Sequence, residues 1–159
     1  MPYSKNALTQ ESYLIPEKLD DSNAIKDFVR KHHGKKVIVV QGLGFVGAVM
    51  SLVCSNALTE EYAVIGVDLP NEDNHWKIKS INEGIFPLIA DDPKISEFYE
   101  SSRIKGNFYA TYDTSAYSYA DVIIVDINLD VQKESEKDGS LKSYNVNLDG
   151  FKKAINKTK

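Results

Sequence analysis

Residues 36–47 read KVIVVQGLGFVG, and this stretch decides the fold class. Its first half is a nearly continuous apolar run, the pattern of a strand that is buried on both faces of a parallel sheet. Its second half has the spacing GxGxxG and opens a helical run. A second apolar run, residues 62–67 (YAVIGV), ends at Asp68. Strand, helix and strand in this order predict a βαβ unit with a right-handed crossover.

Each part of this stretch has a physical role at a dinucleotide site. Gly42 lets the chain turn tightly, Gly44 lets the backbone approach a pyrophosphate, and Gly47 lets the helix pack closely. The N-terminus of the helix offers N–H groups and partial positive charge to phosphates. Asp68 can accept hydrogen bonds from both hydroxyls of an adenosine ribose, and it would repel the 2′-phosphate of NADP. We therefore predict an NAD site. The simpler alternative is a glycine-rich turn and a strand-end aspartate without a ligand.

Composition and charge narrow the classes of function. The 159 residues suit one domain, and the net charge of −4 argues against a nucleic-acid partner. Every apolar run falls short of the roughly 20 residues that span a bilayer. The first residues lack the apolar region of a signal peptide, and a single cysteine, Cys54, cannot form an internal disulfide. We expect a cytoplasmic protein without a membrane or nucleic-acid partner.

The rest of the chain predicts one α/β domain, with a Rossmann-type, doubly wound, mostly parallel sheet. Residues 1–34 are an N-terminal extension, irregular to about residue 20 and then helical over 21–33, where Asp21 or Ser22 can cap the helix and Gly34 can end it. Residues 35–159 are the NAD-binding domain. Further predicted elements are helices at 72–82, 94–102 and 143–156, strands at 108–111 and 122–127, and a charged loop at 133–140.

Other chemistry-bearing residues have simpler interpretations. His32 and His33 point in different directions on a helix, so we favour two exposed cations near its C-terminus over a metal site. His75 is interpreted as a surface residue. The carboxylate pairs at 20–21 and 91–92 are expected in solvated turns or helix caps. Cys54 falls on an apolar helix face, the usual place of a structural thiol. We predict no metal site and no catalytic residue.

The chain resembles the UDP-glucose/GDP-mannose dehydrogenase family over roughly residues 35–155. The family pattern G-x-G-Y/F-V-G is matched at 42–47. The segment K-x-x-x-(L/I)-N-x-G-x-x-P-(I/L) is similar to residues 77–88, KIKSINEGIFPL. The elements T-x-D and A-D-V-x-x-x are matched at 111–113 and 120–125. The N-x-G-x-x-P element makes this resemblance more specific than a general Rossmann match.

The resemblance implies an activity and a set of site residues. Members oxidise the C6 hydroxymethyl of a UDP- or GDP-sugar to a carboxylate with two NAD, and hold the aldehyde stage on a cysteine. By matching positions, Phe45 and Val46 would lie over the pyrophosphate with the glycines, Asp68 and Lys77 would bracket the adenosine ribose, and Thr111 would lie near the cofactor. A homodimer is one assembly that the resemblance allows.

Departures from the family pattern limit these expectations. Leu129 stands where the family motif V-P-T-P has its threonine, and the spacer between Asp68 and Lys77 is longer than usual. The family's nucleophilic cysteine, its lysine and its substrate-binding residues would lie beyond Lys159. We therefore expect a truncated chain that binds NAD without turnover.

Two alternatives stay open. The first is a complete, non-catalytic NAD-binding or regulatory module, which Leu129 favours. The second is a dehydrogenase of the 6-phosphogluconate or hydroxyacid type, which shares the Rossmann start but does not usually carry N-x-G-x-x-P here. The sequence does not identify the sugar.

Overall fold

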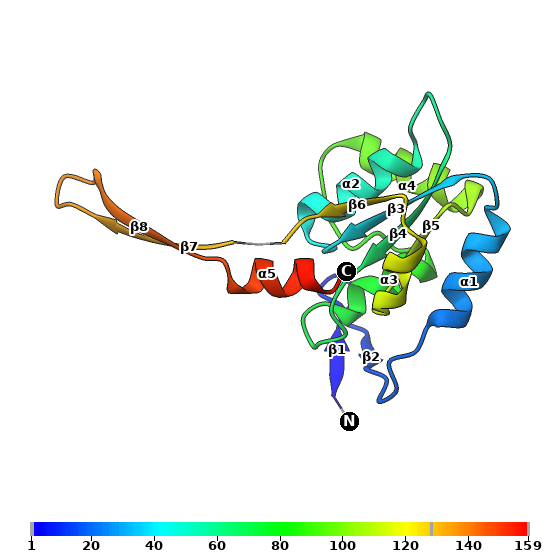
Figure 1. Ribbon diagram of the computed structural model, residues 1–159, viewed down its shortest axis with the longest axis horizontal. Coiled ribbons are helices and arrows are strands. Elements are labelled where there is room, and N and C mark those ends of the chain that lie inside the picture. Colours follow the sequence, from blue (N-terminus) through cyan, green and yellow to red (C-terminus); the bar gives the residue numbers. More distant parts are fainter. Residues whose placement is uncertain (1, 128, 159) are drawn as a thin grey trace. The chain divides into compact units, whose positions relative to one another are not determined.

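The computed structural model describes residues 2–127 and 129–158, which divide between Asp126 and Ile127 into two compact units. In the first unit, four parallel strands form a sheet in the order β5–β4–β3–β6 (Figure 1). The strands are β3 (Lys36–Gln41), β4 (Tyr62–Val67), β5 (Phe108–Thr111) and β6 (Val122–Val125). The predicted parallel α/β sheet is confirmed, and β6 ends two residues before the predicted bound.

The four strands end level with one another. Gln41 of β3 stands opposite Val67 of β4 and Val125 of β6, and Val67 stands opposite Thr111 of β5. The residues that follow the strands therefore share the carboxyl edge of the sheet, where open α/β sheets bind their ligands.

Helices cover both faces of the sheet. One face carries α1 (Ser22–Lys31) and the 3₁₀-helix η1 (Thr114–Tyr119), and the core between them includes Ile25, Val39 and Ile65. The other face carries α2 (Phe45–Ser55), α3 (His75–Glu83) and α4 (Pro93–Lys105). Helices on both faces bury the apolar strands, as their continuous apolar runs predict.

The ends of two helices follow from their local sequence. Asp92 caps α4 by accepting a hydrogen bond from the Lys94 N–H, so the helix-cap interpretation of this carboxylate is confirmed. Gly106 ends α4 and Gly84 ends α3, both in the left-handed conformation that favours glycine.

The N-terminal segment is more ordered than its sequence indicates. Strands β1 (Tyr3–Lys5) and β2 (Ser12–Leu14) form an antiparallel hairpin. The predicted side-chain cap of α1 is wrong: Asp21 occupies the cap position but makes no cap hydrogen bond, and Ser22 bonds to Asp20 instead. The division of the chain at residue 34 stays a prediction.

His32 also differs from its prediction as an exposed cation. It is 5% exposed, and its Nδ1 lies 2.9 Å from the carbonyl oxygen of Phe28, whose ring it contacts. This contact one helical turn back draws the imidazole inward, whereas His33 is exposed.

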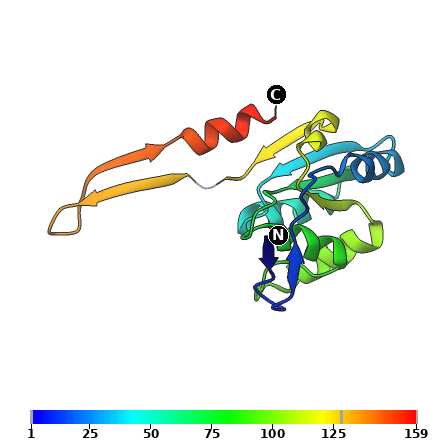
Figure 2. The ribbon, with the colours of Figure 1, turned by 90° about the horizontal axis from the view of Figure 1, so that it is seen from below.

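The second unit contains β7 (Asp130–Ser135), β8 (Leu141–Asn147) and α5 (Asp149–Asn156) (Figure 2). Strands β7 and β8 pair as an antiparallel hairpin. The predicted loop at 133–140 and the predicted helix start at 143 are therefore wrong. The missed signal is the Asp138–Gly139 pair, because Asp-Gly is typical of hairpin turns and Gly139 has a φ of +85°.

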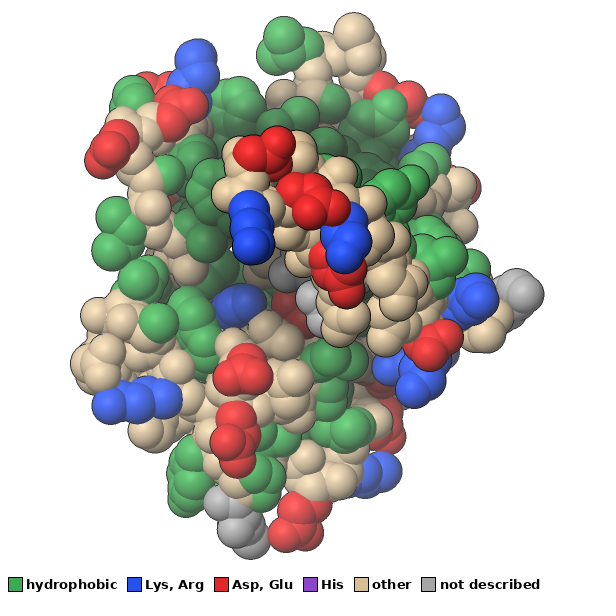
Figure 3. All heavy atoms as spheres, turned by 90° about the vertical axis from the view of Figure 1, so that its left-hand side faces the viewer, with side chains coloured by type: hydrophobic (Ala, Val, Ile, Leu, Met, Phe, Trp, Pro, Cys, Tyr) green, Lys and Arg blue, Asp and Glu red, His purple; other side chains and the backbone are tan. Residues whose placement is uncertain are grey.

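The surface of the described residues carries a mixture of charged and hydrophobic side chains. Acidic and basic side chains are intermingled with hydrophobic ones on the face shown in Figure 3. Among the described helices, none is both long enough and apolar enough to cross a membrane.

Candidate functional site

The glycine-rich turn is tied to the end of the neighbouring strand. Gly42 has a φ of +95°, and its N–H donates to the Val67 carbonyl at 2.8 Å. The next N–H, of Leu43, donates to Oδ2 of Asp68 at 2.9 Å. The predicted tight turn at Gly42 is thus present, and a glycine suits its positive φ.

Leu43 packs the glycine-rich turn against the sheet. Its side chain is fully buried and lies over Gly66 of β4. A Cβ at Gly66 would stand 2.5 Å from Cδ2 of Leu43, so a larger residue here would displace the buried leucine side chain. This contact fixes the height of the turn above the sheet.

Gly47 and Gly44 have different surroundings. A Cβ at Gly47 would stand 2.0 Å from the carbonyl oxygen of Gly42 and 3.0 Å from Oδ2 of Asp126. At Gly47, helix α2 therefore packs closely against the glycine-rich turn, at the Gly42 carbonyl. A Cβ at Gly44 would meet no described atom within 4 Å.

The start of α2 offers its backbone to a ligand. Gly44 is the N-cap residue, and no side-chain cap hydrogen bond is made there among the described residues. The first N–H groups of a helix are favourable sites for phosphate when side chains leave them accessible. Open space at Gly44 and an uncapped helix start are what a diphosphate requires, so the residues present fit the predicted cofactor.

Phe45 and Val46 form the first residues of α2 and are 61% and 57% exposed. Their exposure beside the open N-terminus places them within reach of a molecule bound there.

Asp68 points toward the turn with both carboxylate oxygens engaged. Oδ2 accepts from the Leu43 N–H and Oδ1 accepts from the Leu69 N–H at 2.7 Å. Each carboxylate oxygen has a second lone pair, so the group can still accept hydrogen bonds from a diol. Its role at an adenosine ribose stays a prediction.

Lys77 and Thr111 are bonded within the protein. The Lys77 ammonium donates to Oδ1 of Asn74 at 2.8 Å. Thr111 is fully buried, and its hydroxyl donates to Oδ2 of Asp21 at 2.6 Å. Thr111 still adjoins the site through its backbone, because its carbonyl accepts from the Asp68 N–H at 3.1 Å.

Sequence reasoning missed residues that support the site from a distance. Asn82, the asparagine of the N-x-G-x-x-P element, donates to the Ala110 carbonyl at 2.7 Å and accepts from the Ala110 N–H at 2.9 Å. This side chain therefore fixes α3 to β5. Asp21 lies 90 residues from Thr111 in sequence, so no local pattern could have indicated their contact.

Cys54 and His75 both lie against the interior of the first unit. Cys54 packs against the apolar cluster of Ile38, Val40 and Val64, and burial raises the pKa of its thiol. His75 is 2% exposed, so its predicted surface position is wrong. Burial, and then the nearby Lys79, lower the pKa of this imidazole. Among the described residues, no three His, Cys, Asp or Glu side chains gather as metal ligands.

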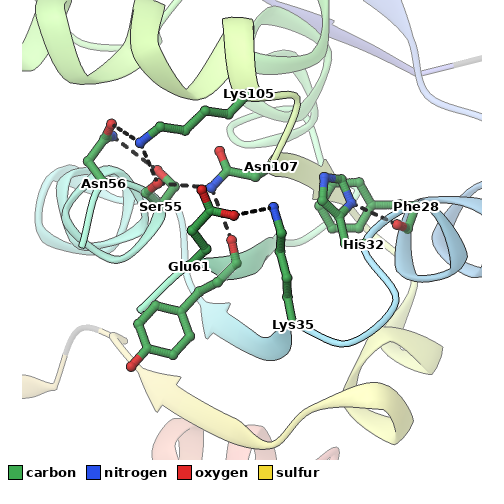
Figure 4. A network of polar contacts seen from close by, with 9 residues as sticks. Phe28, His32, Lys35, Ser55, Asn56, Glu61, Lys105 and Asn107 are labelled. Atoms are coloured by element: carbon green, nitrogen blue, oxygen red, sulfur yellow. Dashed lines mark hydrogen bonds and ion pairs between the residues drawn. The ribbon is translucent and has the colours of Figure 1, made fainter. Parts of the chain in front are cut away.

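The amino edge of the sheet carries a polar network (Figure 4). Asn107 donates from its amide to the carbonyls of Ser55 and Tyr62 at 2.9 and 3.0 Å. Asn56 donates to the Phe98 carbonyl at 2.9 Å, and thereby joins α2 to α4. The network ties helices to strands on the side opposite the glycine-rich turn.

The parallel sheet, the glycine-rich turn at a helix N-terminus and the strand-end aspartate define a dinucleotide-binding Rossmann domain. A family model, described as the UDP-glucose/GDP-mannose dehydrogenase family, NAD binding domain, matches residues 35–159. The chain belongs to this family and carries its NAD-binding domain, so the predicted family and cofactor are confirmed.

Solved structures with the same fold include two dehydrogenases. One is an NDP-N-acetyl-D-galactosaminuronic acid dehydrogenase from Methanosarcina mazei Go1, with a TM-score of 0.62 and 22% identity over 84% of this chain and 26% of that chain. The other is a UDP-D-ManNAc dehydrogenase from Pyrococcus horikoshii, with a TM-score of 0.55 and 22% identity over 76% of this chain and 24% of that chain.

At this identity the likeness shows the fold alone, and the chain spans about a quarter of each of those proteins. No curated protein matches this chain.

Proposed function

We propose that residues 42–47 and Asp68 hold NAD at the carboxyl edge of the sheet. The observation that carries this proposal is the open space at Gly44 beside an uncapped helix start. The backbone N–H groups of the first turn of α2 would bind the diphosphate. Asp68 would accept from the adenosine ribose hydroxyls and exclude a 2′-phosphate by charge repulsion.

The other predicted site residues have supporting parts in this proposal. Phe45 and Val46 would cover the diphosphate with apolar surface, which their exposure supports. Lys77 would lie on the adenosine side, released from Asn74 when it meets the ribose. Thr111 would act through its backbone contact with Asp68. NAD, when bound, supplies the hydride acceptor, and the protein supplies its binding and orientation.

For the complete protein we propose a cytoplasmic nucleotide-sugar 6-dehydrogenase that acts on a UDP- or GDP-sugar, with a homodimer as one assembly to test. This chain by itself would bind NAD without turnover. Its single cysteine, Cys54, is held in the apolar layer between α2 and the sheet, where it is unsuited to attack an aldehyde. Residues 35–159 would act as the cofactor domain, and residues 1–34 would precede it.

A second candidate is a non-catalytic NAD-binding or regulatory module. Leu129 favours it, because this side chain is apolar and 44% exposed at the position of the family's threonine. The two functions predict the same NAD binding, and they differ in whether a longer form of the protein oxidises a sugar nucleotide.

Calorimetric titration of the chain with NAD and NADP tests the cofactor site. We expect tighter binding of NAD, and Asp68→Asn should weaken NAD by about tenfold to a hundredfold, because hydrogen bonds to a charged group are lost. Asp73→Asn, a change at an exposed aspartate of the following loop, is the matched control and should have no effect. Equal affinities for NAD and NADP, or normal NAD binding by Asp68→Asn, would contradict the proposal.

Turnover is tested separately. The chain is mixed with NAD and UDP-glucose or GDP-mannose, and NADH is followed by its fluorescence. We expect none to form. Steady NADH formation would contradict the view that this chain lacks the nucleophile.

A further inference from the structure

The N-terminal segment wraps the outermost strand on one side of the sheet. Strand β5 ends the strand order there. The β1–β2 hairpin packs beside α3 on one face, and α1 covers the other face (Figure 1). Residues 15–21 connect these two positions, so they pass around β5. This segment lies outside the residues that the family model matches.

On the first face, the hairpin caps a helix of the cofactor domain. Ser4 is fully buried; its hydroxyl donates to the Glu72 carbonyl at 2.6 Å and accepts from the Trp76 N–H at 2.9 Å. Trp76 lies in the first turn of α3, whose own cap residue, Asn74, makes no side-chain cap hydrogen bond. Asn6 adds a buried hydrogen bond to Ser80 at 2.9 Å.

At the strand edge, Asp21 forms hydrogen bonds with side chains of β5. Its Oδ2 accepts hydrogen bonds from the Tyr109 hydroxyl at 2.7 Å and from the Thr111 hydroxyl at 2.6 Å. Its backbone N–H donates to Oδ2 of Asp113 at 2.8 Å. Hydrogen bonds to a carboxylate are about twice as strong as neutral ones, so this is a firm attachment.

From Asp21 a continuous path of hydrogen bonds leads to the glycine-rich turn. Asp21 holds the Thr111 side chain, and the Thr111 carbonyl accepts from the Asp68 N–H at 3.1 Å. Oδ2 of Asp68 then accepts from the Leu43 N–H at 2.9 Å. Thr111 thus contacts Asp21 through its side chain and Asp68 through its backbone, while its hydroxyl also accepts from the Asp113 N–H at 3.1 Å.

We propose that Asp21 is a positioning residue of the NAD site, which sets the preference for NAD over NADP by holding Thr111 and, through it, Asp68. The proposal rests on the function proposed above. When Thr111 is released, the Asp68 carboxylate turns away from the ribose. Attraction for the 2′-hydroxyl and repulsion of the 2′-phosphate are then lost together, so the two affinities converge.

The test measures dissociation constants for NAD and NADP in the full chain and in matched variants. Asp21→Ala should reduce the NAD-to-NADP preference by roughly tenfold, the lower end of the effect of losing a hydrogen bond to a charged group. Thr111→Val removes the hydroxyl at nearly constant size and should have the same effect. Asp21→Asn keeps an acceptor oxygen and should restore most of the preference.

Tyr109→Phe is the control for a merely structural role. It removes the other hydrogen bond to Asp21 but leaves the bond from Thr111. It should lower the unfolding temperature without changing the cofactor preference. If Asp21→Ala does not fold, Thr111→Val carries the test.

The outcomes separate the two proposals. A wild-type chain that binds neither cofactor, or binds both equally, contradicts the proposed function itself. A wild-type chain that prefers NAD, with the same preference in Thr111→Val and Asp21→Ala, overturns the positioning role alone. An equal loss of preference in Tyr109→Phe would also overturn it, because the effect would then follow stability.

Discussion

The two edges of the sheet differ in how their polar groups are paired. At the amino edge, the Asn107 amide donates to the carbonyls of Ser55 and Tyr62, so these two carbonyls are paired within the protein. At the carboxyl edge, α2 begins at Gly44 beside open space. Polar groups that the protein pairs for itself stabilise the fold, whereas groups it leaves accessible are available to a ligand.

The largest effect is expected from Gly47→Ala, which should disturb both the fold and the site. Alanine favours a helix, but its Cβ would stand 2.0 Å from the Gly42 carbonyl oxygen. We expect the free energy of unfolding to fall by about 3 kcal/mol, as overpacking does in a rigid place. NAD binding should fall too, because the turn must move. Chemical denaturation and calorimetry measure the two effects.

Gly44→Val is the matched change at the same turn, and it separates the two roles. Open space at Gly44 should limit the loss of stability to about 1 kcal/mol, the usual difference between cap residues. The valine side chain would fill the proposed diphosphate space, so NAD binding should nearly vanish. A variant that still binds NAD normally would show that the diphosphate lies elsewhere.

At the amino edge, Asn107→Ala should give the reverse pattern. It leaves the carbonyls of Ser55 and Tyr62 without their side-chain donor, and we expect a loss of about 2 kcal/mol in the free energy of unfolding. NAD affinity, measured where the variant is folded, should equal that of the wild type. A matching loss of affinity would mean that the two edges are coupled.

His75 should give the first unit a pH dependence. Burial lowers its pKa in the folded state, so the unfolded chain binds protons more readily. Its contribution to stability is therefore present above the usual histidine pKa of about 6.5 and is lost as the pH falls below it. Denaturation at a series of pH values should show this loss, and His75→Gln should reduce it. An identical pH profile in His75→Gln would argue against a buried neutral imidazole.

The smallest effect is expected from the ion pair between Lys35 and Glu61 at the amino edge, whose charged groups are 2.8 Å apart. Both side chains reach water, so screening and side-chain entropy offset most of the attraction. Lys35→Met should change stability by no more than the error of denaturation experiments, and any difference should disappear in high salt. A clear, salt-insensitive loss would mean that the pair is part of the neighbouring network.

Sequence reasoning succeeded where a feature depends on near neighbours. Apolar runs predicted β3, β4 and β5 with their correct bounds. The glycine spacing predicted the turn, because Gly42 needs a positive φ and Gly47 lies against the Gly42 carbonyl oxygen. The position of Asp68 beside the turn was predictable as well, because this residue directly follows the second strand of the βαβ unit.

It failed where the partner is remote in the chain. The β1–β2 hairpin is held through Ser4 by groups near residue 72, and no period in residues 1–20 indicates this. The burial of His75 likewise depends on packing beneath that hairpin, where the Leu14 backbone bonds to its ring. The support that Asp21 gives to Thr111 joins two segments that only the folded chain brings together.

The contact between Leu43 and Gly66 has a consequence for evolution and for engineering. A glycine-rich turn transplanted alone into another sheet would meet a strand whose side chain already fills the space that the leucine needs. Among related sequences, these two positions should change in concert, with a bulkier residue in the strand tolerated only where the turn carries a smaller one.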